Sequence, residues 1–250
     1  MIEEGGLEEA VFHPLDMGPV YKETLMGRLP VEPWNTFSNI VFLAVVAYWS
    51  LRVYPRAKEH LFLACALPVL LVGFIGGTLY HALRDAEVWL WMDWLPILLL
   101  CFSCTILFAR RAGLPWIRLI PLLALPFLLR WMMTAILGWS PTVVLNVEYA
   151  VIGSAVLAPL LLHLHTRSWR RLDRVSLAVA CFGLALAFRS LDSHWLVSWM
   201  PMGTHWLWHL LGGLAVHFLM GYIFQDDLHV HRHVPVERSG AQHAGVRSFT

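Results

Sequence analysis

Residues 61–83, LFLACALPVLLVGFIGGTLYHAL, decide the fold of this 250-residue chain. The run contains no lysine, arginine, aspartate or glutamate. As a helix it is long enough to cross a bilayer, which takes about 20 apolar residues. One similar run precedes it in the chain and five follow it, so we expect spans at 33–53, 61–83, 88–108, 116–137, 142–163, 175–191 and 204–224. The sequence therefore predicts an all-α polytopic membrane protein, a bundle of seven transmembrane helices.

The composition agrees with a membrane protein and with few other classes. Hydrophobic residues make up 58% of the chain and charged residues 14%, against about 25% charged in an ordinary soluble domain. The net charge of +1 gives no reason to expect a nucleic-acid partner. We divide the chain into a polar N-terminal segment (1–31), the seven-helix domain (32–224) and a flexible polar tail rich in histidine (225–250). The sequence does not predict an oligomeric state.

Basic residues predict the orientation in the membrane, because cytoplasmic loops carry an excess of lysine and arginine. Thirteen of the 18 basic residues lie in alternate loops and in the tail: Arg52, Arg56, Lys58, Arg110, Arg111, Arg118, Arg167, Arg170, Arg171, Arg174, Arg232, Arg238 and Arg247. We therefore expect a cytoplasmic C-terminus and an N-terminus outside, in the periplasm, the exterior or an organelle lumen.

Five ionisable residues are expected at one depth, near the outer ends of the spans. Glu32 precedes the first span, His81 ends the second, Asp93 lies early in the third, and His205 and His209 begin the seventh. Ionisable side chains are costly inside a membrane and usually functional there. Their convergence predicts a polar site in the outer leaflet.

The histidines of this set favour a metal site. His205 and His209 are four residues apart, which places them on one helix face, and His81 adds a third imidazole at the same depth. Three neutral imidazoles with an open position are typical of catalytic zinc, and Asp93 could take the proton of the attacking water. Taken singly, the histidine pair is equally consistent with hydrogen-bonded interfacial residues, and Asp93 with a charge favoured by the helix dipole.

Four other charged residues have a structural interpretation. Arg130 and Glu148 are predicted to pair within the bundle, and Arg189 and Asp192 at the end of the sixth span.

Three segments, in this order, resemble one family. They are EPWNTFSN (32–39), GGTLYHALR followed by WMDWLPI (76–84 and 91–97), and HWLWH (205–209). The chain resembles the alkaline ceramidases and the wider seven-helix hydrolase superfamily that includes the adiponectin receptors. The resemblance covers the first, second, third and seventh spans.

The resemblance implies a zinc-dependent intramembrane amidase that cleaves ceramide, or a similar N-acyl lipid entering from the bilayer, into a fatty acid and a sphingoid-type amine. His81, His205 and His209 match the family's zinc ligands, and Asp93 matches its aspartate. Glu32 matches an acidic residue, three before Asn35, that helps to hold a structural calcium ion in the eukaryotic members.

Further calcium ligands, and one expected serine, lack a clear match. Asp16 and Glu23 are possible calcium ligands, and calcium stays open. The family usually has serine four residues before the zinc histidine of the second span, where this chain has Gly77; Thr78, one residue later, is the candidate substitute in the catalytic set.

Other functions remain alternatives. A receptor or sensor could keep zinc for structure without turnover, and the hydrolase could act on another lipid amide or an ester. A haem carrier would need His81 and one histidine of the seventh span on opposite sides of a porphyrin. Retinal binding is disfavoured because the only lysines, Lys22 and Lys58, lie outside the seventh span.

Overall fold

The computed structural model describes residues 14–192 and 194–233, and this part of the chain is helical and contains no strand. Its helices are α1 (Pro33–Ser38), α2 (Ile40–Val53), η1 (Tyr54–Glu59), α3 (Leu61–Leu83), α4 (Glu87–Arg111), η2 (Trp116–Arg118), α5 (Leu119–Trp131), η3 (Met132–Ile136), α6 (Pro141–Thr166), α7 (Leu172–Leu191), η4 (Trp195–Val197) and α8 (His205–His233). Residues 1–13 of the predicted N-terminal segment and 234–250 of the predicted tail lie outside the described residues.

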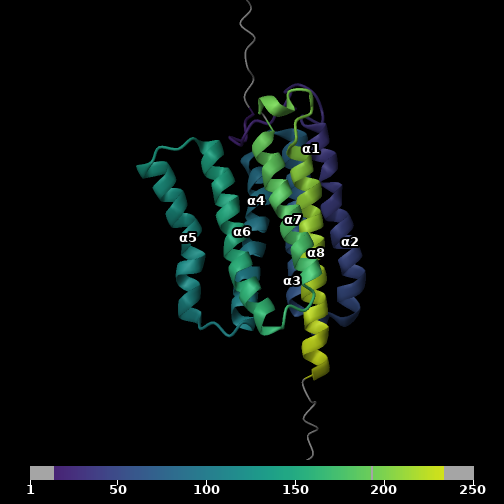
Figure 1. The fold of residues 1–250 in the computed structure, drawn as a ribbon. Coiled ribbons are helices and arrows are strands. Elements are labelled where there is room, and N and C mark those ends of the chain that lie inside the picture. The colour runs from purple at the N-terminus through teal and green to yellow at the C-terminus, as the bar shows by residue number, and fades with distance from the viewer. Residues whose placement is uncertain (1–13, 193, 234–250) are drawn as a thin grey trace, which may run out of the picture.

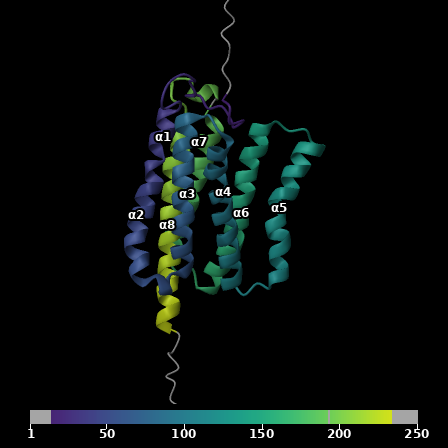
Figure 2. The same cartoon turned by 180° about the vertical axis from the view of Figure 1, so that it is seen from behind.

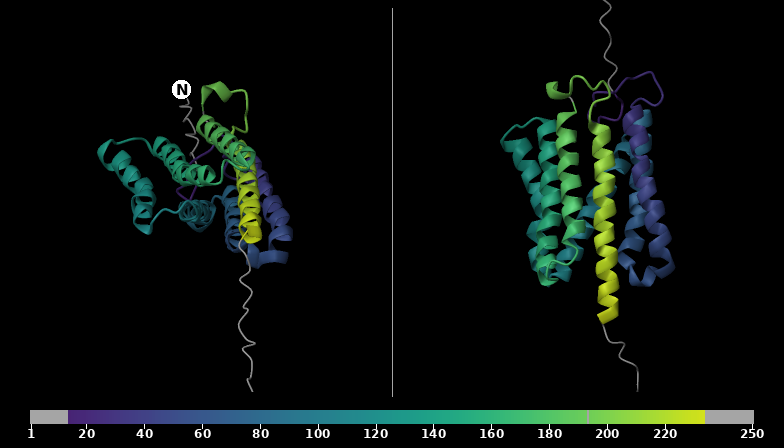
Figure 3. Two further views of the ribbon diagram at one scale, coloured as in Figure 1. Left: turned by 60° about the horizontal axis from the view of Figure 1, so that its bottom comes forward. Right: turned by 45° about the vertical axis from the view of Figure 1, so that its right-hand side comes forward.

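The prediction of seven membrane-spanning helices is confirmed. The helical stretches long and apolar enough to cross a bilayer are Pro33–Glu59, Leu61–Leu83, Glu87–Arg111, Trp116–Ile136, Pro141–Thr166, Leu172–Leu191 and His205–His229. The helices stand side by side as an upright bundle (Figure 1). The same order is seen from behind, with α5 at one edge, next to α6 (Figure 2). The left view of Figure 3 shows α5 at the edge of the bundle, away from α2 and α8.

The first span is interrupted at Asn39, between α1 and α2. The backbone carbonyl of Asn35 accepts hydrogen bonds from the Ser38 hydroxyl (3.0 Å) and the Asn39 side-chain amide (3.0 Å). Short polar side chains that bond to nearby backbone groups compete with helical hydrogen bonding. In the sequence N-T-F-S-N, the carbonyl of Asn35 is therefore bonded to the side chains of Ser38 and Asn39 at the break in the helix.

The apolar core lies between α2, α3, α4, α6 and α8. Val53, Leu63, Phe108 and Leu164 are fully buried there, and Ile223 of α8 completes the contact. In contrast, α5 leaves Phe127 and other apolar side chains exposed. An apolar surface is the expected outside of a helix that faces lipid tails.

The predicted boundary between the last span and the tail is wrong. Helix α8 continues past residue 224 to His233. Asp226 and Asp227, which we expected in a flexible tail, are buried. Asp226 Oδ2 accepts from His163 Nε2 (3.1 Å), Asp227 Oδ2 lies 3.1 Å from His60 Nδ1, and Arg111 forms ion pairs with both carboxylates. These pairings compensate the buried charges, so the helix can continue against the bundle.

Candidate metal centre

The structure brings His81, His205 and His209 together at one end of the bundle. His81 lies in the last turn of α3, and His205 and His209 lie in the first two turns of α8. All three are buried, and each offers one ring nitrogen within 4.8 Å of the others. This is the convergence that the sequence predicted, and its geometry is compatible with one metal ion.

Glu32 fixes the orientation of His81. The Nδ1 atom of His81 lies 2.5 Å from Glu32 Oε2. A carboxylate only accepts, so Nδ1 carries the proton and Nε2 keeps its lone pair. That Nε2 atom is buried and has no hydrogen-bond partner among the described residues. A carboxylate that orients a histidine in this way is typical of metal sites.

His209 is oriented by the interrupted first span. Its Nδ1 atom lies 3.1 Å from the carbonyl oxygen of Asn35 and 2.7 Å from the Ser38 hydroxyl. Because a carbonyl also accepts only, the proton belongs on Nδ1 and the Nε2 lone pair is again available. The break at Asn39 therefore has a role in the site, since it frees the Asn35 carbonyl that accepts the hydrogen bond from His209 Nδ1.

His205 is held from two sides. The Tyr21 ring stacks on it at 3.8 Å between centroids, and Arg189 Nη1 lies 3.4 Å from its Nδ1. The predicted pair of Arg189 and Asp192 is wrong. Instead, Asp192 Oδ1 accepts from the backbone amides of Thr204 (2.7 Å) and His205 (2.8 Å). A carboxylate satisfies the unpaired amides at a helix N-terminus and is favoured there by the helix dipole.

A buried arginine anchors the N-terminal segment beneath the histidines. The Arg84 side chain is fully buried; its Nε donates to Asp16 Oδ2 (2.6 Å), its Nη2 donates to Asp16 Oδ1 (3.0 Å) and to the Pro19 carbonyl (3.1 Å), and its Nη1 pairs with Glu32. Burial would raise the pKa of Glu32, but the hydrogen bond from His81 and the positive charge of Arg84 lower it overall. Glu32 is therefore held as a carboxylate.

The three carboxylates that the resemblance left open as calcium ligands are bonded to groups of the chain itself. Asp16 and Glu32 both bind Arg84, as above. Glu23 accepts hydrogen bonds from the backbone amides of Trp34 (2.9 Å) and Asn35 (2.6 Å). These carboxylate oxygens, of the kind that calcium binds, face donors, and the positive charge between Asp16 and Glu32 belongs to Arg84. The side-chain oxygen of Asn35 is buried without a hydrogen-bond partner among the described residues.

The position of the missing serine is occupied by Asp93. A Cβ atom added at Gly77 would lie 2.5 Å from Asp93 Oδ1 and 3.2 Å from Asn39 Oδ1. The glycine thus makes room for the carboxylate against the backbone of α3. The Thr78 hydroxyl is buried without a hydrogen-bond partner among the described residues, and Thr78 does not line the cavities beside Asp93. Its substitution for the serine stays a prediction.

Asp93 lies where two cavities meet the histidines. The larger, of about 420 Å³, is lined by Asp93, His205 and Arg189 together with apolar residues of α4, α5 and α6. The smaller, of about 30 Å³, is lined by Asp93 and His209, which is enough for a water molecule. The carboxylate therefore has access to both sides of the histidine group.

Charged and aromatic residues border the larger cavity. The predicted pair of Arg130 and Glu148 is confirmed, and both residues line the cavity wall. Arg189 lies over the rings of Tyr149 (4.8 Å) and Trp208 (5.3 Å). A guanidinium over an aromatic face is stabilised by the ring quadrupole, which compensates part of its burial.

Three buried imidazoles, two of them with the proton held on Nδ1, one nearby carboxylate and a cavity make a coherent candidate metal site. When bound, a divalent ion such as zinc would act as a Lewis acid there; imidazole also suits copper, iron and nickel. Comparison with models of known protein families and with curated protein sequences found no match. Fold and site define a seven-helix membrane protein with a candidate metal centre.

The sequence analysis assigned no role to several residues that build this centre. Arg84 and Ser38 lay within quoted motifs, but their partners are distant in the chain. Tyr21 lies in a segment with no periodic pattern. Arg189 was placed at the correct depth and given the wrong partner. An arginine at the end of a membrane span was itself the signal, because such a charge needs a compensating group when it is buried.

Proposed function

We propose that the protein is a zinc-dependent intramembrane hydrolase that cleaves the acyl amide bond of a ceramide-like membrane lipid. The observation that carries the proposal is the position of Asp93, which borders the group of His81, His205 and His209 from two cavities. A general base must lie within reach of the proton it removes. This arrangement supplies a base, a metal site and a space for substrate together.

The cavity supports a lipid as the substrate. Apolar residues of α4, α5 and α6, including Ile97, Phe127 and Ile152, line much of its wall. Phe127 is 52% exposed, so the cavity reaches the outer surface on the α5 side. An acyl chain could enter there directly from the bilayer, with its polar end toward Asp93 and His205. Arg189 and Tyr149 would meet the hydroxyl groups near the amide.

The chemistry assigns a role to each group of the chain. Bound zinc would polarise the amide carbonyl and lower the pKa of a coordinated water to about 7. Asp93 takes one proton from the attacking water, whose oxygen forms the new bond to the carbonyl carbon. The carbon–nitrogen bond then breaks, and Asp93 delivers the proton to the leaving nitrogen. The products are a fatty acid and an amine, and Glu32 holds His81 in the required tautomer throughout.

Two measurements on the full-length protein in detergent test the proposal. Metal content by inductively coupled plasma mass spectrometry should give about one zinc per chain, lost in His205→Ala/His209→Ala. Release of fatty acid from a fluorescent N-acyl sphingoid lipid should be lost in Asp93→Asn while the zinc remains. Zinc without turnover of N-acyl lipids or lipid esters would contradict a hydrolase and favour a structural metal. Absence of zinc would refute the site.

The nature of the scissile bond can be tested separately. An ester analogue with the same acyl chain and polar group would be assayed beside the amide. Cleavage of the ester alone would keep the metal centre and refute the amidase.

A further inference from the structure

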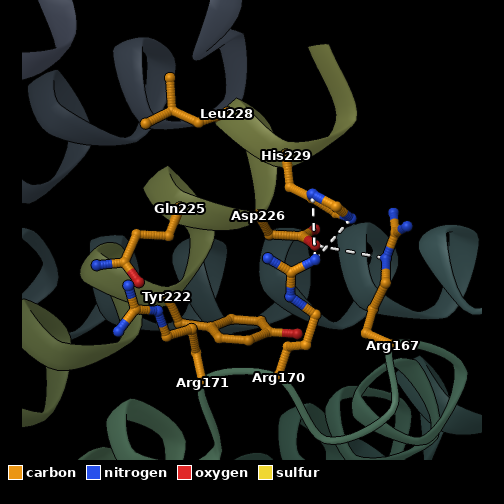
Figure 4. A pocket seen from close by; sticks show the side chains of 8 residues that line it. All are labelled: Arg167, Arg170, Arg171, Tyr222, Gln225, Asp226, Leu228 and His229. Atoms are coloured by element: carbon orange, nitrogen blue, oxygen red, sulfur yellow. Dashed lines mark hydrogen bonds and ion pairs between the residues drawn. The ribbon is translucent and has the colours of Figure 1, made fainter. Parts of the chain in front are cut away.

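A second pocket lies at the opposite end of the bundle, where the connection from α6 to α7 meets α8 (Figures 1 and 4). Its volume is about 300 Å³. It is lined by Arg167, Arg170, Arg171, Tyr222, Gln225, Asp226, Leu228 and His229. No step of the proposed hydrolysis uses these residues.

The pocket has an excess of positive charge. Arg167, Arg170 and Arg171 face it with a single carboxylate, that of Asp226. That carboxylate is already bound by Arg111 (2.7 Å) and by His163 (3.1 Å), and Arg167 Nε lies 3.5 Å away. Arg171 forms no ion pair with a described side chain in the structure. The local field therefore favours an anion.

Two polar atoms of the pocket need a partner that the described residues do not supply. Tyr222 is 2% exposed, and its hydroxyl is buried without a hydrogen bond; the side-chain oxygen of Gln225 is in the same condition. A buried polar group without a partner destabilises the protein. Figure 4 shows the Tyr222 ring among the arginine side chains, with Gln225 and Asp226 beside it. The tyrosine can donate to an anion, whereas the glutamine oxygen needs a donor.

The connection from α6 to α7, which carries the arginines, has an uncommon backbone conformation. Ser168, Trp169 and Arg171 all have positive φ angles, of 52°, 58° and 58°. Non-glycine residues rarely adopt this region, and such strain persists only where the surrounding structure enforces it. In this connection it places Arg170 and Arg171 on either side of the pocket.

From the arginines, the buried Tyr222 hydroxyl and the Gln225 oxygen, we propose that this pocket binds a glycerophosphate group: a phosphate ester for the arginines and Tyr222, with a hydroxyl that donates to Gln225. Arginine binds phosphate through paired hydrogen bonds. The group could belong to the headgroup of phosphatidylglycerol or to free glycerol phosphate. Because the pocket lies at the basic end of the bundle, either source can reach it without passing the metal centre.

The test uses full-length protein in nanodiscs of phosphatidylcholine, with and without phosphatidylglycerol. Native mass spectrometry counts the anionic lipids that remain bound after transfer to detergent. Wild type should retain phosphatidylglycerol, and Arg170→Ala/Arg171→Ala should weaken retention at least about tenfold. The matched control, Arg56→Ala/Arg118→Ala, removes the same charge from exposed loops at the same end and should retain the lipid as wild type does.

Two further arms keep the proposal falsifiable. Tyr222→Phe removes only the unpaired hydroxyl and should weaken retention several-fold, with a thermal unfolding temperature no lower than that of wild type. Free glycerol 3-phosphate identifies the source: displacement of the lipid indicates that the soluble ester binds, and no displacement indicates the membrane lipid. Equal loss in both double variants would overturn the proposal in favour of diffuse attraction, and so would no preference for phosphatidylglycerol over phosphatidylcholine. Zinc content is unaffected in all arms, so this outcome is independent of the proposed hydrolysis.

Discussion

Replacing Gly77 by serine should damage the metal centre, although serine is the residue that the family resemblance leads one to expect there. The added Cβ would lie 2.5 Å from Asp93 Oδ1, and relief of this overlap requires a shift of the carboxylate by about 1 Å to ordinary contact distance. A misplacement of about 1 Å in a catalytic group can cost about 100-fold in rate. This corresponds to about 2.7 kcal/mol of transition-state stabilisation.

The assay is hydrolysis of the fluorescent N-acyl lipid by Gly77→Ala and Gly77→Ser, with zinc content measured on the same samples. Both variants should lose activity and keep zinc, because Gly77 makes room for Asp93 and offers no ligand itself. Gly183→Ala, in the membrane helix α7, is the matched control: its Cβ would meet nothing within 4 Å, and we expect activity near that of wild type. Wild-type or higher activity in Gly77→Ser would refute the reasoning.

Three further predictions concern the groups around the histidines. Glu32→Gln should weaken zinc binding by about 10–100-fold through the loss of orientation of His81, which a chelator competition titration measures. Arg84→Met should cost about 3–5 kcal/mol in the free energy of unfolding, because the two carboxylates that bind the guanidinium would be buried without a partner; removal of calcium with a selective chelator should not change the unfolding of the wild type. Asp192→Ala should cost about 1–2 kcal/mol, because it removes the cap that holds the N-terminus of α8 at His205, and the unfolding free energy in denaturant should report it.

The seven spans could be predicted because each depends on local composition alone. The run at 61–83 specifies a membrane helix wherever it packs. Its end at Leu83 coincides with that of α3, and the second and seventh spans carry the histidines at the expected depth. Successive membrane helices run in opposite directions, so the end of the second span and the start of the seventh lie at the same depth. The convergence of His81 with His205 and His209 could therefore be predicted without knowledge of packing.

Contacts between distant segments could not be predicted in the same way. Arg189 was assigned to Asp192 because they are neighbours in sequence, whereas the fold directs Asp192 to the amides of α8 and Arg189 to His205. The end of α8 was misplaced for a similar reason. The acidic pair Asp226 and Asp227 indicates a solvated tail until His60, His163 and Arg111 are seen to surround it.

At the two places that lack a clear family match, another residue of this chain occupies the space or supplies the charge. At Gly77 the missing side chain leaves space, and Asp93 fills that space. Near Glu32 the resemblance implied a calcium ion, and the Arg84 guanidinium supplies positive charge to Asp16 and Glu32. Considered alone, each position would weaken its motif. The volume at Gly77 and the charge near Glu32 are nevertheless balanced by Asp93 and Arg84. A motif compares each position separately, whereas the chemistry depends on a residue together with the neighbour that occupies its place. The absence of the serine is therefore a weak argument against the proposed hydrolysis, and the position of Asp93 supports that proposal.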